Sequence, residues 1–204
     1  MTVLKPTDNE LLSAIVAGDE EAFAVLYRRR QGGIYRFALQ MSGSTALSED
    51  VTQEVFMILM RDDFNYDASR GPLQAFLIGI ARNLIRQRLG REQFYVSMDD
   101  EQDGGPISDR LYADDCPLEE LSRGETIESI RKAILSLPAR YREVVVLCEL
   151  QELSYADAAG ILECAIGTVR SRLHRARGML IEKLRPQTTI EPAPDRVKQA
   201  RCFA

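Results

Sequence analysis

Four arginines and the only histidine of the chain lie within the eight residues Arg170–Arg177, inside the stretch GTVRSRLHRARGML. No acidic side chain interrupts this stretch, although the whole chain has a formal net charge of −5. Guanidinium groups bind phosphates and pair bidentately with guanine. A cluster of them on one short segment therefore indicates a polyanionic partner. The alternative is a solvated basic helix face of no special function.

The apolar residues around this cluster favour the functional alternative. On a helix, with about 100° per residue, Val169, Leu173, Ala176 and Leu180 form a narrow stripe opposite the basic side chains. Upstream, the segment 155–162 predicts a short helix capped by Ser154, and after a tight turn Thr168 can cap the second helix. Two short helices with a polar, arginine-bearing second helix indicate a helix-turn-helix, whose second helix enters the major groove of DNA.

Charge is distributed unevenly along the rest of the chain. Residues 68–91 contain five arginines and no acid, whereas residues 92–125 contain eleven acids and only two arginines. Residues 164–185 are basic again. Because local fields matter more to a polyanion than net charge does, two basic modules around an acidic connector are compatible with nucleic-acid binding.

Apolar residues recur at helical spacing, and no stretch alternates as a strand would. We therefore predict an all-α chain with two small helical domains joined by a flexible acidic linker, the second being a four-helix domain with the helix-turn-helix. The expected boundaries are an N-terminal domain at 1–92, the linker at 93–117, a C-terminal domain at 118–185 and a disordered, proline-containing tail at 186–204.

Several classes of protein are disfavoured. The chain has no apolar run long enough to cross a membrane and its N-terminus does not resemble a secretory signal, so we expect a cytoplasmic protein without membrane insertion. Its four cysteines form no CxxC pair, so we expect neither a metal nor a cofactor. No GxxxxGK[ST], HExxH or GxSxG motif is present, and we do not expect an enzyme.

Four stretches together carry a family resemblance. LSYADAAGILECAIGTVRSRLHRARGML resembles the DNA-reading part of bacterial RNA polymerase sigma factors of the extracytoplasmic-function (ECF) subfamily. ALSEDVTQEVFMILM is similar to the helix of that family that grips the polymerase clamp, and LQAFLIGIARNLIRQRLGR to its promoter-melting segment. LPARYREVVVLCELQELSY is a further matching stretch. The resemblance implies binding to core RNA polymerase (clamp and flap), recognition of −35 and −10 promoter elements, and promoter opening.

The resemblance places −35 recognition, on duplex DNA, in the basic second helix. The bases and nearby phosphates are assigned to Arg170, Ser171, His174 and Arg175, and backbone positioning to Thr168, Arg172 and Arg177.

Recognition of the −10 element as a single strand is assigned to the segment before Pro72 and to the helix after it. On that helix Arg82 and Arg86 are expected opposite the core stripe, where arginines could track phosphates. The residues proposed for this element are Tyr66, Arg70, Phe76, Arg82, Asn83 and Arg86. Phe76 stands where the family usually has Trp, and Asn83 could instead be an ordinary surface or internally hydrogen-bonded residue.

Polymerase binding is assigned to one face of the helix over Leu47–Met60. Exposed methionines mixed with polar residues suggest a partner surface. The expected contacts are Asp50, Gln53, Glu54, Phe56 and Met57. The alternative is that Phe56 and Met60 pack on a neighbouring helix of the same domain.

The resemblance also implies an anti-sigma factor as a partner. The acidic linker could mimic a nucleic-acid strand or be a plain spacer. Two other functions remain open at this stage: an ordinary helix-turn-helix regulator that needs no polymerase, and a sigma mimic that sequesters an anti-sigma factor and binds no DNA.

Overall fold

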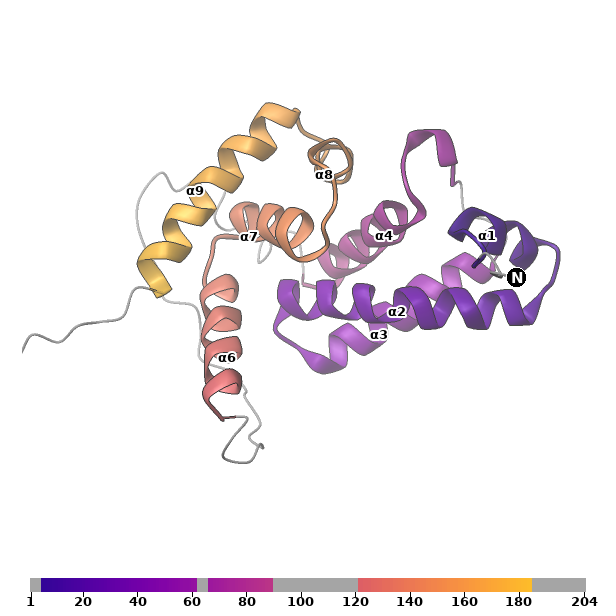
Figure 1. Cartoon of the computed structure of the whole chain (residues 1–204), viewed down its shortest axis with the longest axis horizontal. Coiled ribbons are helices and arrows are strands. Elements are labelled where there is room, and N and C mark those ends of the chain that lie inside the picture. Colours follow the sequence, from indigo (N-terminus) through magenta and orange to yellow (C-terminus); the bar gives the residue numbers. More distant parts are fainter. Residues whose placement is uncertain (1–4, 62–65, 90–120, 185–204) are drawn as a thin grey trace, which may run out of the picture.

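The computed structural model describes residues 5–61, 66–89 and 121–184, and every regular element in these ranges is helical (Figure 1). This confirms the all-α prediction. The linker 93–117 and the tail 186–204 lie outside the described residues. The N-terminal unit contains α1 (Asp8–Val16), α2 (Glu20–Ser42), α3 (Thr45–Met60), the short 3₁₀ turn η1 (Ala68–Arg70) and α4 (Leu73–Arg88). The C-terminal unit contains α6 (Leu121–Leu135), α7 (Ala139–Val145), the π-helical turn η2 (Val146–Leu150), α8 (Tyr155–Leu162) and α9 (Ile166–Leu184).

The helix ends follow local side-chain chemistry. Thr7 and Glu10 form a reciprocal capping box at the start of α1. Asp19 accepts hydrogen bonds from two backbone N–H groups at the start of α2, so a new helix begins here after α1. Ser154 caps α8 as predicted, because its hydroxyl accepts the N–H of Asp157 at 3.1 Å.

Helix α2 is longer than the sequence pattern suggests. From the sequence, the apolar patterns over 22–27 and 34–41 fit two different helices, but a single helix of 23 residues runs through both segments and through Gly32–Gly33 between them. A Cβ atom at Gly33 would lie 3.4 Å from Oε1 of Gln151 in the C-terminal unit, and the Gln151 amide donates to the Gly33 carbonyl at 3.1 Å. The missing side chain therefore allows close packing here rather than a turn.

The buried apolar residues of the two units form one continuous cluster. In the N-terminal unit, α2 packs against α1, α3 and α4. In the C-terminal unit, α9 packs against α6, α7 and α8. The units meet where α8 lies against α4 and where α6, α7 and η2 contact α2 (Figure 1). The sequence pattern predicts both units but nothing about this contact.

The end of α2 provides a stability test. Gly43 follows α2 with a φ of 70°, and its N–H donates to the Leu39 carbonyl at 2.8 Å. A side chain is strained at this φ. We expect Gly43→Ala to lower the free energy of unfolding by about 1–2 kcal/mol in urea denaturation.

Gly178→Ala is the matched control, because Gly178 lies inside α9 and nothing is within 4 Å of the added Cβ. It should raise stability by about 0.5–1 kcal/mol. Effects of the same sign at both positions would contradict this reading of the α2 end.

Candidate DNA and polymerase interface

A helix-turn-helix is built from α8, a turn at 163–165 and α9. Ala158 and Leu162 of α8 and Val169, Leu173 and Ala176 of α9 are buried. Glu163 adopts a left-handed conformation, with φ of 54°, and its N–H donates to the Gly160 carbonyl. This reversal of the chain sets the angle between the two helices.

The start of α9 differs from the sequence prediction. Thr168 was expected to cap this helix, but the helix begins at Ile166 and the N–H groups of Thr168 and Val169 both donate to the Ala165 carbonyl. Thr168 is thus the third helical residue and is half-buried. Its carbonyl accepts the hydroxyl of Ser171 at 3.0 Å.

The predicted −35 residues largely share one exposed face of α9. Arg170, Ser171, His174 and Arg175 are exposed, and Arg172 is half-buried. The Arg170 guanidinium lies 5.8 Å from the centroid of the Tyr155 ring on α8. No acidic partner for Arg170 or Arg175 is found in the described part of the chain. Their guanidinium groups can therefore reach an external ligand.

Arg177 is tied to its own unit. Its Nε donates to Oε1 of Glu149 in η2 at 3.2 Å, and a second nitrogen of the guanidinium binds the same oxygen. The hydrogen bond to this carboxylate and its charge raise the pKa of Arg177 above its ordinary value. The side chain remains more than half exposed, so it can still approach a phosphate.

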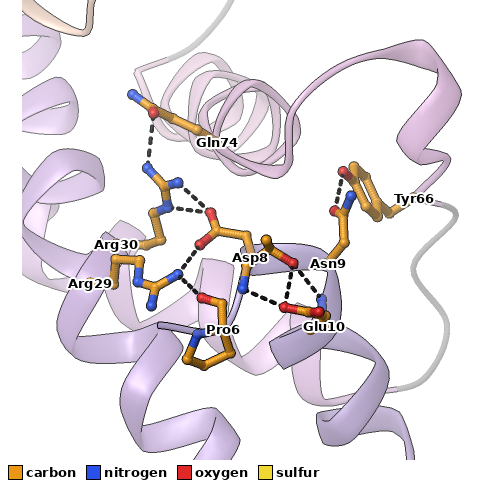
Figure 2. A network of polar contacts seen from close by, with 9 residues as sticks. Pro6, Asp8, Asn9, Glu10, Arg29, Arg30, Tyr66 and Gln74 are labelled. Atoms are coloured by element: carbon orange, nitrogen blue, oxygen red, sulfur yellow. Dashed lines mark hydrogen bonds and ion pairs between the residues drawn. The ribbon is translucent and has the colours of Figure 1, made fainter. Parts of the chain in front are cut away.

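The predicted −10 residues fall into two groups. Tyr66 and Phe76 have ring centroids 5.3 Å apart. The Tyr66 hydroxyl is within hydrogen-bond distance of Oδ1 of Asn9 (Figure 2) and also of the Gly71 carbonyl. Partial burial and the nearby carboxylates of Asp8 and Asp67 raise the pKa of Tyr66. Arg70 and Asn83 are exposed, and Arg86 is half-buried. The packed rings of Tyr66 and Phe76, together with the hydrogen bonds of Tyr66, therefore hold the segment at η1 in place. The same rings can also offer an aromatic face to a ligand.

Arg82 is a correction. It was expected to project from α4 toward DNA, but it is 4% exposed. Its Nε donates to Oε1 of Glu143 on α7 at 2.6 Å, and Nη1 donates to the Ile161 carbonyl on α8 at 3.2 Å. Side chains at Ile78, Ala81 and Ile85 are buried as well. Helix α4 is thus covered on more than the single stripe that the sequence predicts.

The outward face of α3 is polar with exposed methionines. Asp50 and Gln53 are exposed, and Met57 and Met60 are 53% and 62% exposed. Glu54 forms an ion pair with Arg88 of α4, whose guanidinium is also 3.9 Å from Oδ2 of Asp50. Apolar groups next to acids on one helix face are suited to a protein partner.

Phe56 is the second correction. It was expected to contact polymerase, but it is 2% exposed. Its ring lies 4.6 Å from the Tyr27 ring and 6.1 Å from the Phe23 ring, both on α2. The prediction that Phe56 contacts polymerase is therefore wrong for this structure, and the alternative of packing on a neighbouring helix holds for Phe56 but not for Met60.

Three residues at the contact between the units had no role in our sequence analysis. Arg142 donates to the Met41 carbonyl at the end of α2, Glu143 pairs with Arg82, and Gln151 accepts from Gln74 through its carbonyl at 3.0 Å. Burial lowers the pKa of Arg142. For Arg142 and Glu143, the available sequence signal was their polar character between the apolar positions of α7.

Within the described residues, no helix is long and apolar enough to span a membrane. Nor do His, Cys, Asp and Glu side chains cluster there in a way that could hold a metal ion.

Comparison with known proteins decides the family. The models for Sigma-70 region 2 and Sigma-70, region 4 match residues 26–95 and 127–180. The chain is 33% identical over 180 residues to the ECF RNA polymerase sigma factor SigM of Mycobacterium tuberculosis, covering 87% of this chain and 85% of SigM. The chain belongs to the ECF family of RNA polymerase sigma factors. Its role is that of a sigma factor in transcription initiation, and this family is not a family of enzymes.

Other ECF sigma factors give the same result. SigW of Bacillus subtilis is 30% identical over 178 residues, with 85% of this chain and 95% of SigW covered. Among solved structures, the sigma factor RpoE in complex with the anti-sigma factor NepR from Bartonella quintana has a TM-score of 0.56 and 29% identity, covering 81% of this chain and 98% of that one. CnrH in complex with the cytosolic domain of CnrY has a TM-score of 0.62 at 22% identity, covering 86% and 95%, and shares the fold.

Two adjacent residues of α3, one buried and one exposed, can be distinguished by mutation. Phe56→Ala removes a buried ring and should lower the free energy of unfolding by about 3–5 kcal/mol. Met57→Ala removes an exposed side chain and should change it by less than about 0.5 kcal/mol. Urea denaturation of the two variants measures this difference, and equal losses would contradict the burial described for Phe56.

Proposed function

We propose that this ECF sigma factor binds core RNA polymerase, reads the −35 element with α9 and the −10 element with η1 and α4, and opens the promoter. The observation that carries the proposal is the exposed face of α9, where Arg170, Ser171, His174 and Arg175 lie without acidic partners in the described part of the chain. Such a face suits direct contact with base edges and phosphates in the major groove.

The two units have different tasks in this proposal. The N-terminal unit, within residues 1–92, docks on the polymerase clamp through Asp50, Gln53, Glu54 and Met57 of α3 and holds a single DNA strand. The C-terminal unit, within 118–185, contacts the polymerase flap and duplex DNA. Residues 93–117 connect them, and 186–204 form a tail.

In the −10 element, Arg70, Asn83 and Arg86 are the side chains proposed to reach the strand directly. Arg70 and Asn83 are exposed, which supports this assignment. Tyr66 and Phe76 provide the aromatic rings against which an unstacked base would pack in the segment at η1. Unstacking costs a few kcal/mol, so this segment must supply compensating contacts.

An anti-sigma factor is the second proposed partner. Bartonella RpoE was solved in complex with the anti-sigma factor NepR, and this chain shares its fold at 29% sequence identity. We place the protein in the cytoplasm, where bacterial polymerase transcribes.

Run-off transcription with purified core polymerase tests the function. Specific initiation from a genomic template only when this protein is added is the expected result. Tight operator binding by the free protein, with no polymerase-dependent initiation on any template, would instead indicate an ordinary helix-turn-helix regulator.

A single side chain tests the −35 assignment. If Arg175 pairs bidentately with a base, Arg175→Ala should weaken binding to the −35 duplex by about 1–3 kcal/mol and relax the preference for that base. Holoenzyme binding to promoter and base-substituted duplexes at fixed salt measures both quantities.

Lys183→Ala is the matched control, since it removes one positive charge from the last turn of α9, beyond the basic cluster. It should weaken binding slightly and equally on all duplexes. If Arg175→Ala behaves like Lys183→Ala, Arg175 makes no base contact.

A further inference from the structure

Helix α1 reaches the segment at η1 through the side chain of Asn9. The amide oxygen Oδ1 of Asn9 is 2.9 Å from the hydroxyl oxygen of Tyr66, which lies just before η1 (Figure 2). These two residues are 57 positions apart in the sequence. Neither the apolar pattern nor the family resemblance assigns Asn9 a role, so this contact is visible only in the structure.

The Tyr66 side chain is held at its ring and at its tip. The ring packs against Phe76 of α4 with an angle of 52° between the two planes. The hydroxyl has one proton and two acceptors within reach, Oδ1 of Asn9 at 2.9 Å and the Gly71 carbonyl at 3.2 Å. Without Asn9 the hydroxyl would keep an acceptor only in its own segment, and the link from that segment to α1 would be lost.

Helix α1 is a firm support for this contact, because the residue before Asn9 anchors it to two other helices. Asp8 accepts hydrogen bonds from Arg29 and from Nε of Arg30 on α2, both at 2.7 Å (Figure 2). Arg30 in turn donates to Oε1 of Gln74 on α4 at 2.9 Å. The Asp8 side chain is 13% exposed, so solvent screens these ion pairs less than it screens surface pairs. The position of α1 is therefore fixed relative to α2 and α4.

We infer that Asn9 is a positioning residue for recognition of the −10 element, because it fixes the Tyr66 ring at the place where an unstacked base would pack. This inference rests on the proposed function. Stacking on an aromatic ring by itself tolerates any base. A preference for one base arises when the ring and the polar groups around it keep a single geometry. Asn9 acts through Tyr66 and does not touch the strand itself.

Four variants test this role. Asn9→Ala removes the acceptor, and Tyr66→Phe removes the donor while keeping the ring. Asn9→Asp keeps an acceptor oxygen on a side chain of the same length, so it should restore what Asn9→Ala loses. Ser13→Ala is the matched control, since Ser13 is exposed on the same helix and its hydroxyl donates to the Asn9 backbone carbonyl at 3.0 Å. Asn9 is exposed as well, and circular dichroism checks that each variant keeps its helices.

Amide hydrogen exchange of the free proteins measures the positioning without any DNA. The N–H of Arg70 donates to the Asp67 carbonyl at 3.0 Å in η1, so its exchange reports how firmly this turn is held. We expect this exchange to be about threefold to tenfold faster in Asn9→Ala and in Tyr66→Phe, and unchanged in Asn9→Asp and Ser13→Ala. Equal exchange in Asn9→Ala and the unmodified chain would overturn the inference, whether or not the chain supports transcription.

Base preference measures what the positioning does for recognition. The probe is a promoter DNA found by run-off transcription, with its −10 element already single-stranded and substituted one base at a time. In holoenzyme binding at fixed salt, Asn9→Ala should lower the affinity ratio between the promoter base and its substitutes about threefold to tenfold at one position. Asn9→Asp should restore this ratio, although its added negative charge weakens binding to all probes alike. Ser13→Ala should leave the ratio unchanged.

A double variant shows whether Asn9 acts through the tyrosine. If the two side chains work as one unit, Asn9→Ala should cause no further loss of base preference in a chain that already carries Tyr66→Phe. Losses of equal size with and without Tyr66→Phe would mean that Asn9 acts by another route, and this would overturn the inference.

The exchange and binding measurements separate the two proposals. Faster exchange together with a weaker base preference in Asn9→Ala supports the inference. Faster exchange with an unchanged preference overturns the claim that Asn9 serves recognition. Faster exchange with no promoter transcribed at all would leave the Asn9–Tyr66 contact as the support of η1 and contradict the proposed function instead.

Discussion

Helix α4 has to pack against both halves of the chain, and this constraint shapes the rest of the structure. Leu73 and Leu77 are buried on one side, and Ile78, Ala81 and Ile85 are buried on a neighbouring one. A helix covered so widely has few positions left for a charged side chain. Arg82 lies at one of the buried positions, so a carboxylate and a carbonyl must come from outside α4 to satisfy it. The position of α7 and α8 is therefore coupled to one guanidinium.

Helix α9, in contrast to α4, is buried only along a narrow apolar stripe. Val169, Leu173 and Ala176 are buried, and the intervening positions are left to polar and basic side chains. Because the stripe is narrow, packing fixes the rotation of α9 and thereby the direction of its basic face. The net charge of −5 does not oppose this arrangement, since the acids lie elsewhere in the sequence. A partner that approaches α9 meets the local charge rather than the average.

Much of the fold follows from local patterns. Helical spacing predicts α3, α4, α8 and α9, and side-chain caps such as Ser154 fix where helices begin. The exposed face of α9 was also predicted, because the side of a helix opposite its apolar stripe faces solvent. Where a local signal was ambiguous, the prediction failed. The apolar patterns over 22–27 and 34–41 fit two different helices, but in the structure one helix runs through both, and Gln151 packs against Gly33 between them.

The errors at the candidate site have one common cause. Phe56 and Arg82 each lie at a position where their own helix, considered alone, would leave the side chain exposed to solvent. Tyr27 and Phe23 of α2 cover Phe56, and Glu143 of α7 covers Arg82. Such contacts join residues far apart in sequence, and they produce no periodic pattern of apolar residues in either segment. Contact between the units could therefore be found only from the structure.

Two arginines, one exposed and one buried, show how burial decides what an ion pair can do. Arg177 and Arg82 are both bound to a glutamate, through Glu149 and Glu143. The first pair is about half exposed, so water screens it and can replace either partner, and Arg177 can exchange its carboxylate for a phosphate with little change in the fold. The second pair is enclosed, so the same exchange requires whole helices to move. Identical chemistry thus gives an adjustable contact on α9 and a conformational restraint on α4.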